Sequence, residues 1–195
     1  MASVLAVNNY PTRERFERLE KCLKDNGARV TSVDWERASP RLFSSHDGVV
    51  LSGSPDMMSE NRTVSKFRKE MDAILDSKVP VLGVCFGHQM MARAFGAEIV
   101  KDGHHVLDMV RTKVLESDPL FEGLPRSLTL LESRHEIVKS LPQGFRLLAS
   151  SATSKIATMK HESRPLYGVQ FHPERYTVEN PDGNAVVGNF VRLLG

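Results

Sequence analysis

Short apolar runs alternate with amphipathic segments through the first half of the chain. The runs are rich in β-branched residues and too short for helices, which is typical of strands buried on both faces of a parallel sheet. These predicted strands cover residues 3–7, 29–34, 47–51 and 79–84. In the segments between them, apolar residues recur at helical spacing. The predicted helices cover residues 12–26, 64–75 and 88–95. A regular alternation of strand and helix predicts an α/β fold with a parallel sheet.

The second half of the chain has a different pattern. Short apolar runs follow one another with turn residues between them, which predicts an antiparallel extension of the sheet or a mixed sheet. These strands are predicted over residues 97–100, 106–115, 128–131, 146–149, 156–160 and 166–171. Residues 184–194 are predicted to close the fold as a helix. We find no internal repeat or linker and assign residues 1–195 to one domain.

The apolar run at residues 79–84 leads into the sequence Gly83-Val84-Cys85-Phe86-Gly87. Glycines between a strand and a helix allow a sharp turn that exposes one side chain, and this pattern is the thiol version of the nucleophile elbow. A helix N-terminus favours thiolate over thiol, and the Phe86 N–H would point toward a developing oxyanion. The alternative is a buried, inert cysteine in a core strand. The flanking glycines favour a nucleophile.

A second motif, Gly168-Val-Gln-Phe-His172-Pro-Glu174, ends a predicted strand at a proline. His172 and Glu174 are two residues apart, so they share a face in extended chain. A catalytic cysteine needs a base to take its proton, and that base needs an acceptor to orient it. A lone histidine before proline is more often part of a surface turn, but together Cys85, His172 and Glu174 supply all three parts.

These two motifs, with the Leu51–Pro55 loop and residues 118–125, resemble those of class I glutamine amidotransferases. The resemblance spans most of the chain. It implies a flavodoxin-like fold: a central, mostly parallel sheet flanked by helices, with a small antiparallel extension. It also implies hydrolysis of the glutamine side-chain amide through a γ-glutamyl thioester on Cys85, with His172 and Glu174 completing the triad and no metal.

The resemblance also identifies residues around the substrate. Phe86 matches the backbone donor of the oxyanion hole, and Gln89 matches a residue that contacts the substrate glutamine. Gly53 and Ser54 lie in the segment that matches the second oxyanion element, where the family usually has Gly-Gly-Pro. The Cβ of Ser54 resists a positive φ, so we expect this loop to be rearranged without substrate.

Residues 131–136 occupy the place of the family's Ser-His-x-Asp segment. Ser133 matches, and the resemblance places Ser133 and His135 among the glutamine-binding residues. Arg134 stands where histidine is usual, and Glu136 replaces aspartate. Backbone contacts to the substrate's α-amino and α-carboxylate groups survive such changes. An ordinary polar turn is the alternative for this segment.

Within the family, the chain most resembles the glutaminase subunits of two-subunit GMP synthases. The support is its short length, the sequence Phe-Glu-Gly-Leu-Pro at residues 121–125, and the spacing of residues after the triad. This resemblance implies a partner in the form of a separate synthetase subunit, which carries ATP and magnesium and aminates XMP to GMP. The glutaminase itself is then expected to need no cofactor.

Three alternatives remain open at this stage. The glutaminase subunit of anthranilate synthase has similar motifs, although there serine usually follows the triad glutamate, where this chain has Arg175. A pseudo-glutaminase that regulates a partner would be favoured by the loss of a triad member, and none is lost. A stress-type cysteine hydrolase or deglycase normally lacks the His-Pro-Glu sequence.

The composition of the chain limits the protein class, the kinds of partner and the cellular compartment that we expect. The chain has 195 residues, 41% of them hydrophobic and 26% charged, as in an ordinary globular protein. A net charge of +2 argues against nucleic acid as the main partner. Cys22 and Cys85 form no disulfide or metal framework, which favours the reducing cytoplasm. The N-terminus has no signal-peptide pattern, and no apolar run is long enough to span a membrane. Four further histidines, His46, His104, His105 and His161, are expected in exposed polar roles.

Overall fold

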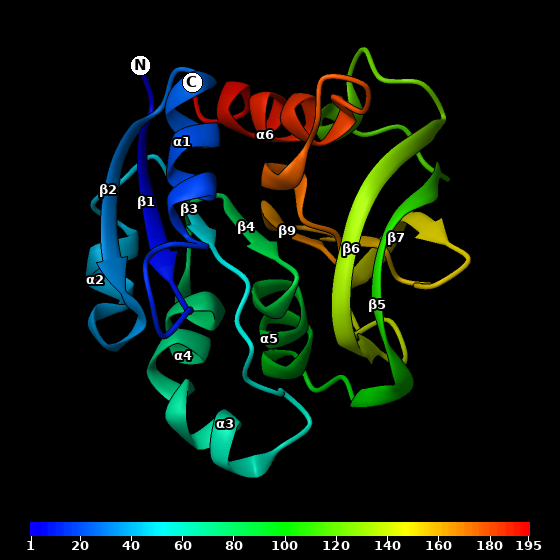
Figure 1. Cartoon of the computed structure of the whole chain (residues 1–195). Coiled ribbons are helices and arrows are strands. Elements are labelled where there is room, and N and C mark those ends of the chain that lie inside the picture. The colour runs from blue at the N-terminus through cyan, green and yellow to red at the C-terminus, as the bar shows by residue number, and fades with distance from the viewer.

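The computed structural model describes residues 1–195, except for the side chain of His104. Five strands form the parallel part of one nine-stranded sheet, four of them from the first half of the chain and one from near its C-terminus (Figure 1). The five parallel strands are β1 (Ser3–Asn8), β2 (Arg29–Asp34), β3 (Gly48–Leu51), β4 (Val81–Val84) and β9 (Leu166–Val169). They lie in the order β2-β1-β3-β4-β9. Every residue of β3, β4 and β9 is buried, as the continuous apolar runs predict.

Four antiparallel strands continue the same sheet beyond β9. They are β5 (Ile99–Val114), β6 (Ser127–Val138), β7 (Phe145–Ser151) and β8 (Thr158–His161), and the order continues β9-β8-β7-β5-β6. The strands predicted at 97–100 and 106–115 are joined into β5, whose pairing with β6 shifts register between Lys101 and Val106. The register shift, typical of a β-bulge, therefore joins two predicted strands into one long strand of the predicted antiparallel extension.

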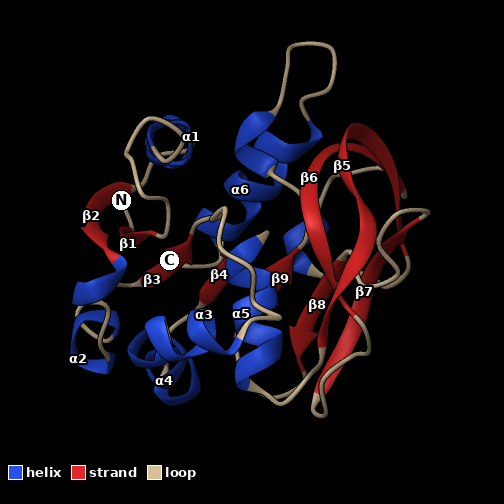
Figure 2. Cartoon of the chain, turned by 60° about the horizontal axis from the view of Figure 1, so that its bottom comes forward, coloured by secondary structure: helices blue, strands red, loops and turns tan.

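Helices cover both faces of the parallel part of the sheet (Figures 1 and 2). One face carries α1 (Glu17–Asp25) and α6 (Asp182–Arg192). The other face carries α2 (Pro40–Phe43), α3 (Asn61–Lys66), α4 (Arg68–Asp76) and α5 (Phe86–Ala94). Alternate residues of β1 serve the two cores: Val4 and Ala6 face α1, and Leu5 and Val7 face α4. This three-layer arrangement confirms the α/β prediction.

Helix boundaries differ from the predicted ones in two places. The helix predicted over 12–26 begins only at Glu17, because residues 11–16 form bends and turns that carry Arg15 toward the carboxyl end of β1. The helix predicted over 64–75 is interrupted at Phe67, which ends α3 and precedes α4. The short helix α2 and the 3-10 turns at Trp35–Arg37, Pro119–Phe121 and Pro173–Arg175 lacked a periodic signal.

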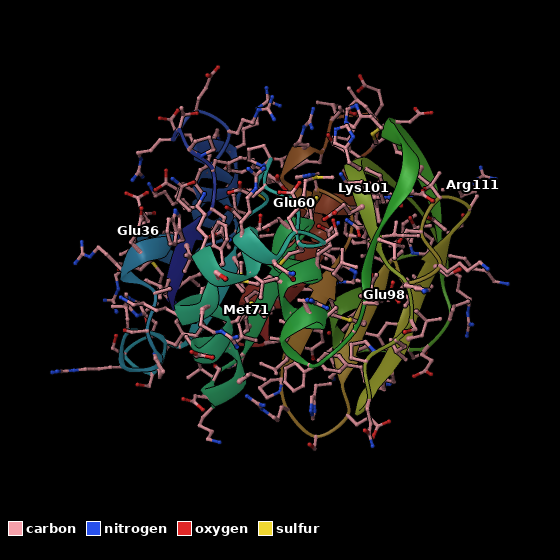
Figure 3. All side chains as sticks on the ribbon, turned by 90° about the horizontal axis from the view of Figure 1, so that it is seen from below. Glu36, Glu60, Met71, Glu98, Lys101 and Arg111 are labelled. Carbon is pink, nitrogen blue, oxygen red and sulfur yellow. The ribbon has the colours of Figure 1, made fainter. Side chains whose placement is uncertain are left out.

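Charged side chains lie around the outside of the molecule. Figure 3 shows Glu36, beside α2, and Arg111, on β5, at opposite flanks. Among the residues that the structure describes, no helix is long and apolar enough to cross a membrane. The assignment of the chain to one domain remains a prediction, consistent with a sheet that runs through both halves.

Candidate active site

Cys85 occupies the sharp turn between β4 and α5. Its backbone has φ 50° and ψ −97°, and it is the only non-glycine residue of the described backbone with a positive φ. A β-carbon on Gly83 would lie 2.5 Å from the Gly87 carbonyl oxygen, so glycine is needed for this close approach. A non-glycine residue at positive φ is strained and is often found at a functional site. The predicted elbow is therefore present.

Cys85 is 94% buried. Its Sγ atom lies 3.5 Å from the Ser133 carbonyl oxygen, and the Gln170 side-chain amide donates to it at 3.7 Å. Because α5 begins at Phe86, the thiol lies at the N-terminus of this helix, where the backbone favours negative charge. The position suits a nucleophilic thiolate.

His172 and Glu174 form a close pair beside this thiol. His172 Nδ1 lies 2.8 Å from Glu174 Oε1, and the His172 backbone N–H donates to the Leu131 carbonyl at 2.7 Å. Burial lowers the pKa of His172, but the charges of Glu174 and Cys85 and hydrogen bonds to both outweigh it. The pKa is held well above its ordinary value. His172 is thus suited to carry a proton between Cys85 and a leaving group.

The loop Ser52–Pro55 packs directly on His172. A β-carbon on Gly53 would lie 2.9 Å from His172 Cε1 and would collide with the Tyr10 hydroxyl, so this position also requires glycine. Ser54 is not among the residues with a positive φ. Ser54 thus avoids the positive φ that its Cβ disfavours, and the rearrangement of this loop without substrate stays a prediction.

Two neighbouring hollows open next to these residues. A chamber of about 140 Å³ is lined by Cys85 and Gln89, and an outer cavity of about 470 Å³ is lined by His172 and Glu174. Both are bordered by Arg15, Ser54, His105, Ser133 and His135. Most of the predicted site residues therefore meet around one cleft at the carboxyl ends of the parallel strands, where α/β proteins bind ligands.

Gln89 and Glu136 close the floor of the inner chamber. Gln89 Nε2 donates to the Glu136 carbonyl at 2.8 Å and to Gln170 Oε1 at 3.3 Å. The Glu136 carboxylate accepts the Ser59 backbone N–H at 3.3 Å. The Gln89 amide nitrogen is therefore occupied by the protein.

The segment Ser133–Glu136 lies in β6 and is not a turn. Ser133 and His135 face the cleft, whereas the Arg134 side chain lies fully buried on the opposite face of the strand. There Arg134 pairs with Glu132 at 3.0 Å and with Asp102 at 2.8 Å, and it donates to the Thr153 carbonyl. Its departure from the family pattern thus does not place a guanidinium in the cleft.

The cleft also holds residues that sequence reasoning missed. His105 is exposed, as predicted, but it also stacks on His135 with ring centroids 4.3 Å apart and an interplanar angle of 17°. Burial and the nearby Glu174 raise the pKa of Tyr10 far above its ordinary value. Arg15 borders both hollows. These residues come from distant segments that only the fold brings together, so no local motif marks them.

The predictions of exposed roles for His161 and His104 have different outcomes. His161 packs against the rings of Phe95 and Phe145 and is only partly exposed, and the prediction for His104 lies outside the described side chains. The described side chains include no group of three or more His, Cys, Asp or Glu residues that could hold a metal ion.

Known proteins resemble this chain over nearly its whole length. Residues 12–193 match the family glutamine amidotransferase class-I. The chain is 37% identical over 191 residues to a glutamine-hydrolyzing GMP synthase subunit of Archaeoglobus fulgidus, covering 97% of each. It is 40% identical over 148 residues to the protein of the same name from Thermococcus kodakarensis, covering 76% of each.

A solved structure agrees with these sequence relatives. The crystal structure of a putative GMP synthase subunit from Thermoplasma acidophilum superposes with a TM-score of 0.86 at 30% identity, covering 100% of this chain and 94% of that one. A glutamine amidotransferase structure from Thermotoga maritima, 20% identical with a TM-score of 0.74, shows the same fold. The chain therefore belongs to the class-I glutamine amidotransferase family.

Proposed function

We propose that this protein is the glutaminase subunit of a two-subunit GMP synthase. The observation that carries the proposal is the pairing of His172 with Glu174 at 2.8 Å, beside a cysteine held in a strained strand-to-helix turn. The resemblance to GMP synthase subunits of archaea, over up to 97% of the chain, supports the choice of pathway.

In the first half of the proposed reaction, the Cys85 thiolate attacks the side-chain amide carbon of glutamine. The Phe86 N–H and the Gly53–Ser54 loop stabilise the tetrahedral oxyanion. His172 gives its proton to the leaving nitrogen, so the C–N bond breaks and ammonia departs. A γ-glutamyl thioester remains on Cys85.

In the second half, His172 takes a proton from water as the water oxygen attacks the thioester carbon. The C–S bond breaks, glutamate leaves and the Cys85 thiolate is restored. Glu174 keeps the His172 ring oriented and stabilises its charged form in both halves.

The cleft is suited to hold an amino acid. We propose that the inner chamber takes the glutamine side chain, with Gln89, Ser133 and His135 contacting the substrate. Arg134 is occupied by Glu132 and Asp102, whereas Arg15 has no salt bridge among the described residues and borders both hollows. Arg15 is therefore the proposed partner of the α-carboxylate.

The ammonia is proposed to pass to a separate synthetase subunit. That partner would bind ATP and magnesium and aminate XMP to GMP, while this subunit needs no cofactor of its own. Free ammonia is mostly protonated at neutral pH, so a shielded path between docked subunits would favour transfer. The proposed setting is the cytoplasm.

The test is reconstitution of GMP synthesis. The protein is mixed with the candidate synthetase, ATP, magnesium, XMP and glutamine, and GMP is measured. Glutamine-dependent GMP formation that disappears with Cys85→Ala, but persists when ammonium replaces glutamine, is the expected result. Turnover with chorismate and the anthranilate partner, and none with XMP, would assign the chain to anthranilate synthesis instead.

A further inference from the structure

A buried glutamate that the triad mechanism does not use lies behind the cleft. Glu70 is on α4, next to Met71, which Figure 3 labels. Its side chain is completely buried. Burial raises the pKa of Glu70 to about 8, opposed by a hydrogen bond from Asn9. Burying a carboxyl group costs free energy of folding, so the contacts of Glu70 indicate its role in the protein.

Hydrogen bonds connect Glu70 to the loop beside the nucleophile. Asn9, just beyond the end of β1, donates from Nδ2 to Glu70 Oε1 at 3.2 Å and to the Ser52 carbonyl at 3.3 Å. The Asn9 backbone N–H donates to Ser52 Oγ at 2.8 Å, and this hydroxyl donates to the Gly53 carbonyl at 2.9 Å. Asn9 and Ser52 are each 99% buried, so these bonds have no competition from solvent.

The end of this chain of contacts lies at the reacting groups. Gly53 packs against His172, and Ser54 lines the chamber that contains Cys85. The donors of an oxyanion hole must be held to a fraction of an ångström, and that precision comes from the residues behind them. Asn9 joins α4 to this loop, because its one side-chain amide bonds both Glu70 and Ser52.

We infer that Glu70 is a positioning residue, which holds the Ser52–Pro55 loop in its oxyanion-stabilising place by fixing Asn9. The inference rests on the proposed glutaminase function. Glu70 Oε1 supplies the acceptor that keeps the Asn9 amide aimed at Ser52. The second oxygen, Oε2, has no hydrogen-bond partner among the described residues, so a negative charge on Glu70 would be buried without compensation.

The test compares Glu70→Leu with Glu70→Gln. Leucine removes the acceptor, so kcat for glutamine hydrolysis should fall on the order of 10- to 100-fold, with a much smaller change in KM. Glutamine keeps an acceptor oxygen and should restore most of kcat. Asp72→Ala, on the exposed side of the same helix, is the matched control and should leave kcat unchanged.

A second measurement separates loop positioning from general damage. Alkylation of Cys85 by iodoacetamide forms no oxyanion, so its rate should be nearly equal in the wild type and Glu70→Leu. Ser52→Ala breaks the same chain of contacts at its other end. Its effect on kcat should not add to that of Glu70→Leu, because both act through one loop.

The outcomes distinguish the two proposals. A wild-type protein without glutaminase activity, even with its partner, overturns the proposed function and, with it, the role assigned to Glu70. An active wild type with unchanged kcat in Glu70→Leu overturns the inference alone. Equal losses of kcat and of Cys85 alkylation would also overturn it, because they indicate a disrupted core.

Discussion

The parallel and antiparallel parts of the sheet contribute to the site in different ways. The parallel part carries the proposed reacting groups, because Cys85 and the Ser52–Pro55 loop follow the carboxyl ends of β4 and β3, and His172 follows β9. The antiparallel part supplies one wall of the cleft through Ser133 and His135 of β6. The proposed reacting groups thus lie on short turns at the ends of parallel strands. The wall that would contact the substrate is made by alternate side chains of one long strand, β6.

The difference extends to how each part is stabilised. Around the parallel strands, two apolar cores are covered by helices on both faces. The antiparallel part also buries a charged group, Arg134, among Glu132, Asp102 and the Thr153 carbonyl. We therefore expect substitutions of Cys85 and His172 to affect mainly catalysis, and substitution of Arg134 to affect mainly stability.

The largest effect is expected at the triad. Cys85→Ala and His172→Ala should each lower kcat on the order of 10⁵-fold or more, because triad members act as a unit. Glu174→Gln should cost less, since Glu174 orients the base and transfers no proton. The measurement is glutamate release at neutral pH with the partner present. Near-normal turnover by His172→Ala would contradict the assignment of the base.

The second prediction concerns Arg134. Arg134→Met leaves the fully buried Glu132 carboxylate without its guanidinium, which should lower the free energy of unfolding by about 3–5 kcal/mol. Chemical denaturation measures this. Arg134→Met with Glu132→Leu should recover part of the loss, because no uncompensated charge remains. If Arg134→Met has the same free energy of unfolding as the wild type, the buried pair contributes little to stability.

The parallel part of the sheet and its motifs were largely predictable from sequence, and the buried side of the antiparallel part was not. Cys85 is marked by glycines two residues to either side, and His172 and Glu174 lie together in one extended segment, so their meeting depends on local geometry. Arg134 could not be placed, because its direction depends on the register of β6 and on a bulge in β5. Its partner Asp102 lies 32 residues away in sequence.

The loop at Ser54 shows another limit of sequence reasoning. Comparison with the usual Gly-Gly-Pro predicted a rearranged loop, but the backbone conformation of Ser54, which has no positive φ, could not be read from the sequence. The hydrogen bonds that link Glu70 and Asn9 to this loop could not be predicted either, because, like the contacts of Arg134, they depend on how the strands pair. The segments that carry Asn9 and Ser52 become neighbours only through the pairing of β1 with β3.

The third prediction uses the pH dependence of stability. The pKa of Glu70 is about 4.5 when unfolded and about 8 when folded, so the folded state keeps a proton that the unfolded state loses between these values. The wild type should therefore lose stability relative to Glu70→Gln as pH rises through this window, by at most about 1.4 kcal/mol per pH unit. Denaturation curves at pH 4.5 and pH 7.5 measure the difference. A constant difference at both pH values would mean that Glu70 ionises normally.

The smallest effect is expected at Arg15. Arg15→Ala should raise KM for glutamine about 10-fold with little change in kcat, because the lost contact binds the substrate and its transition state alike. Arg18→Ala is the matched control, since Arg18 lines only the outer cavity. Equal KM values for Arg15→Ala and the wild type would remove Arg15 from the glutamine site.

The most direct test of the triad is labelling by a glutamine-derived electrophile, followed by peptide mass spectrometry. Burial raises the pKa of Cys22 to about 12, so at neutral pH this cysteine remains a protonated, unreactive thiol. We predict that Cys85 alone is modified, that glutamine protects it, and that His172→Ala slows the reaction strongly. Modification of Cys22, or of Cys85 without protection by glutamine, would contradict the assignment of Cys85 as the nucleophile.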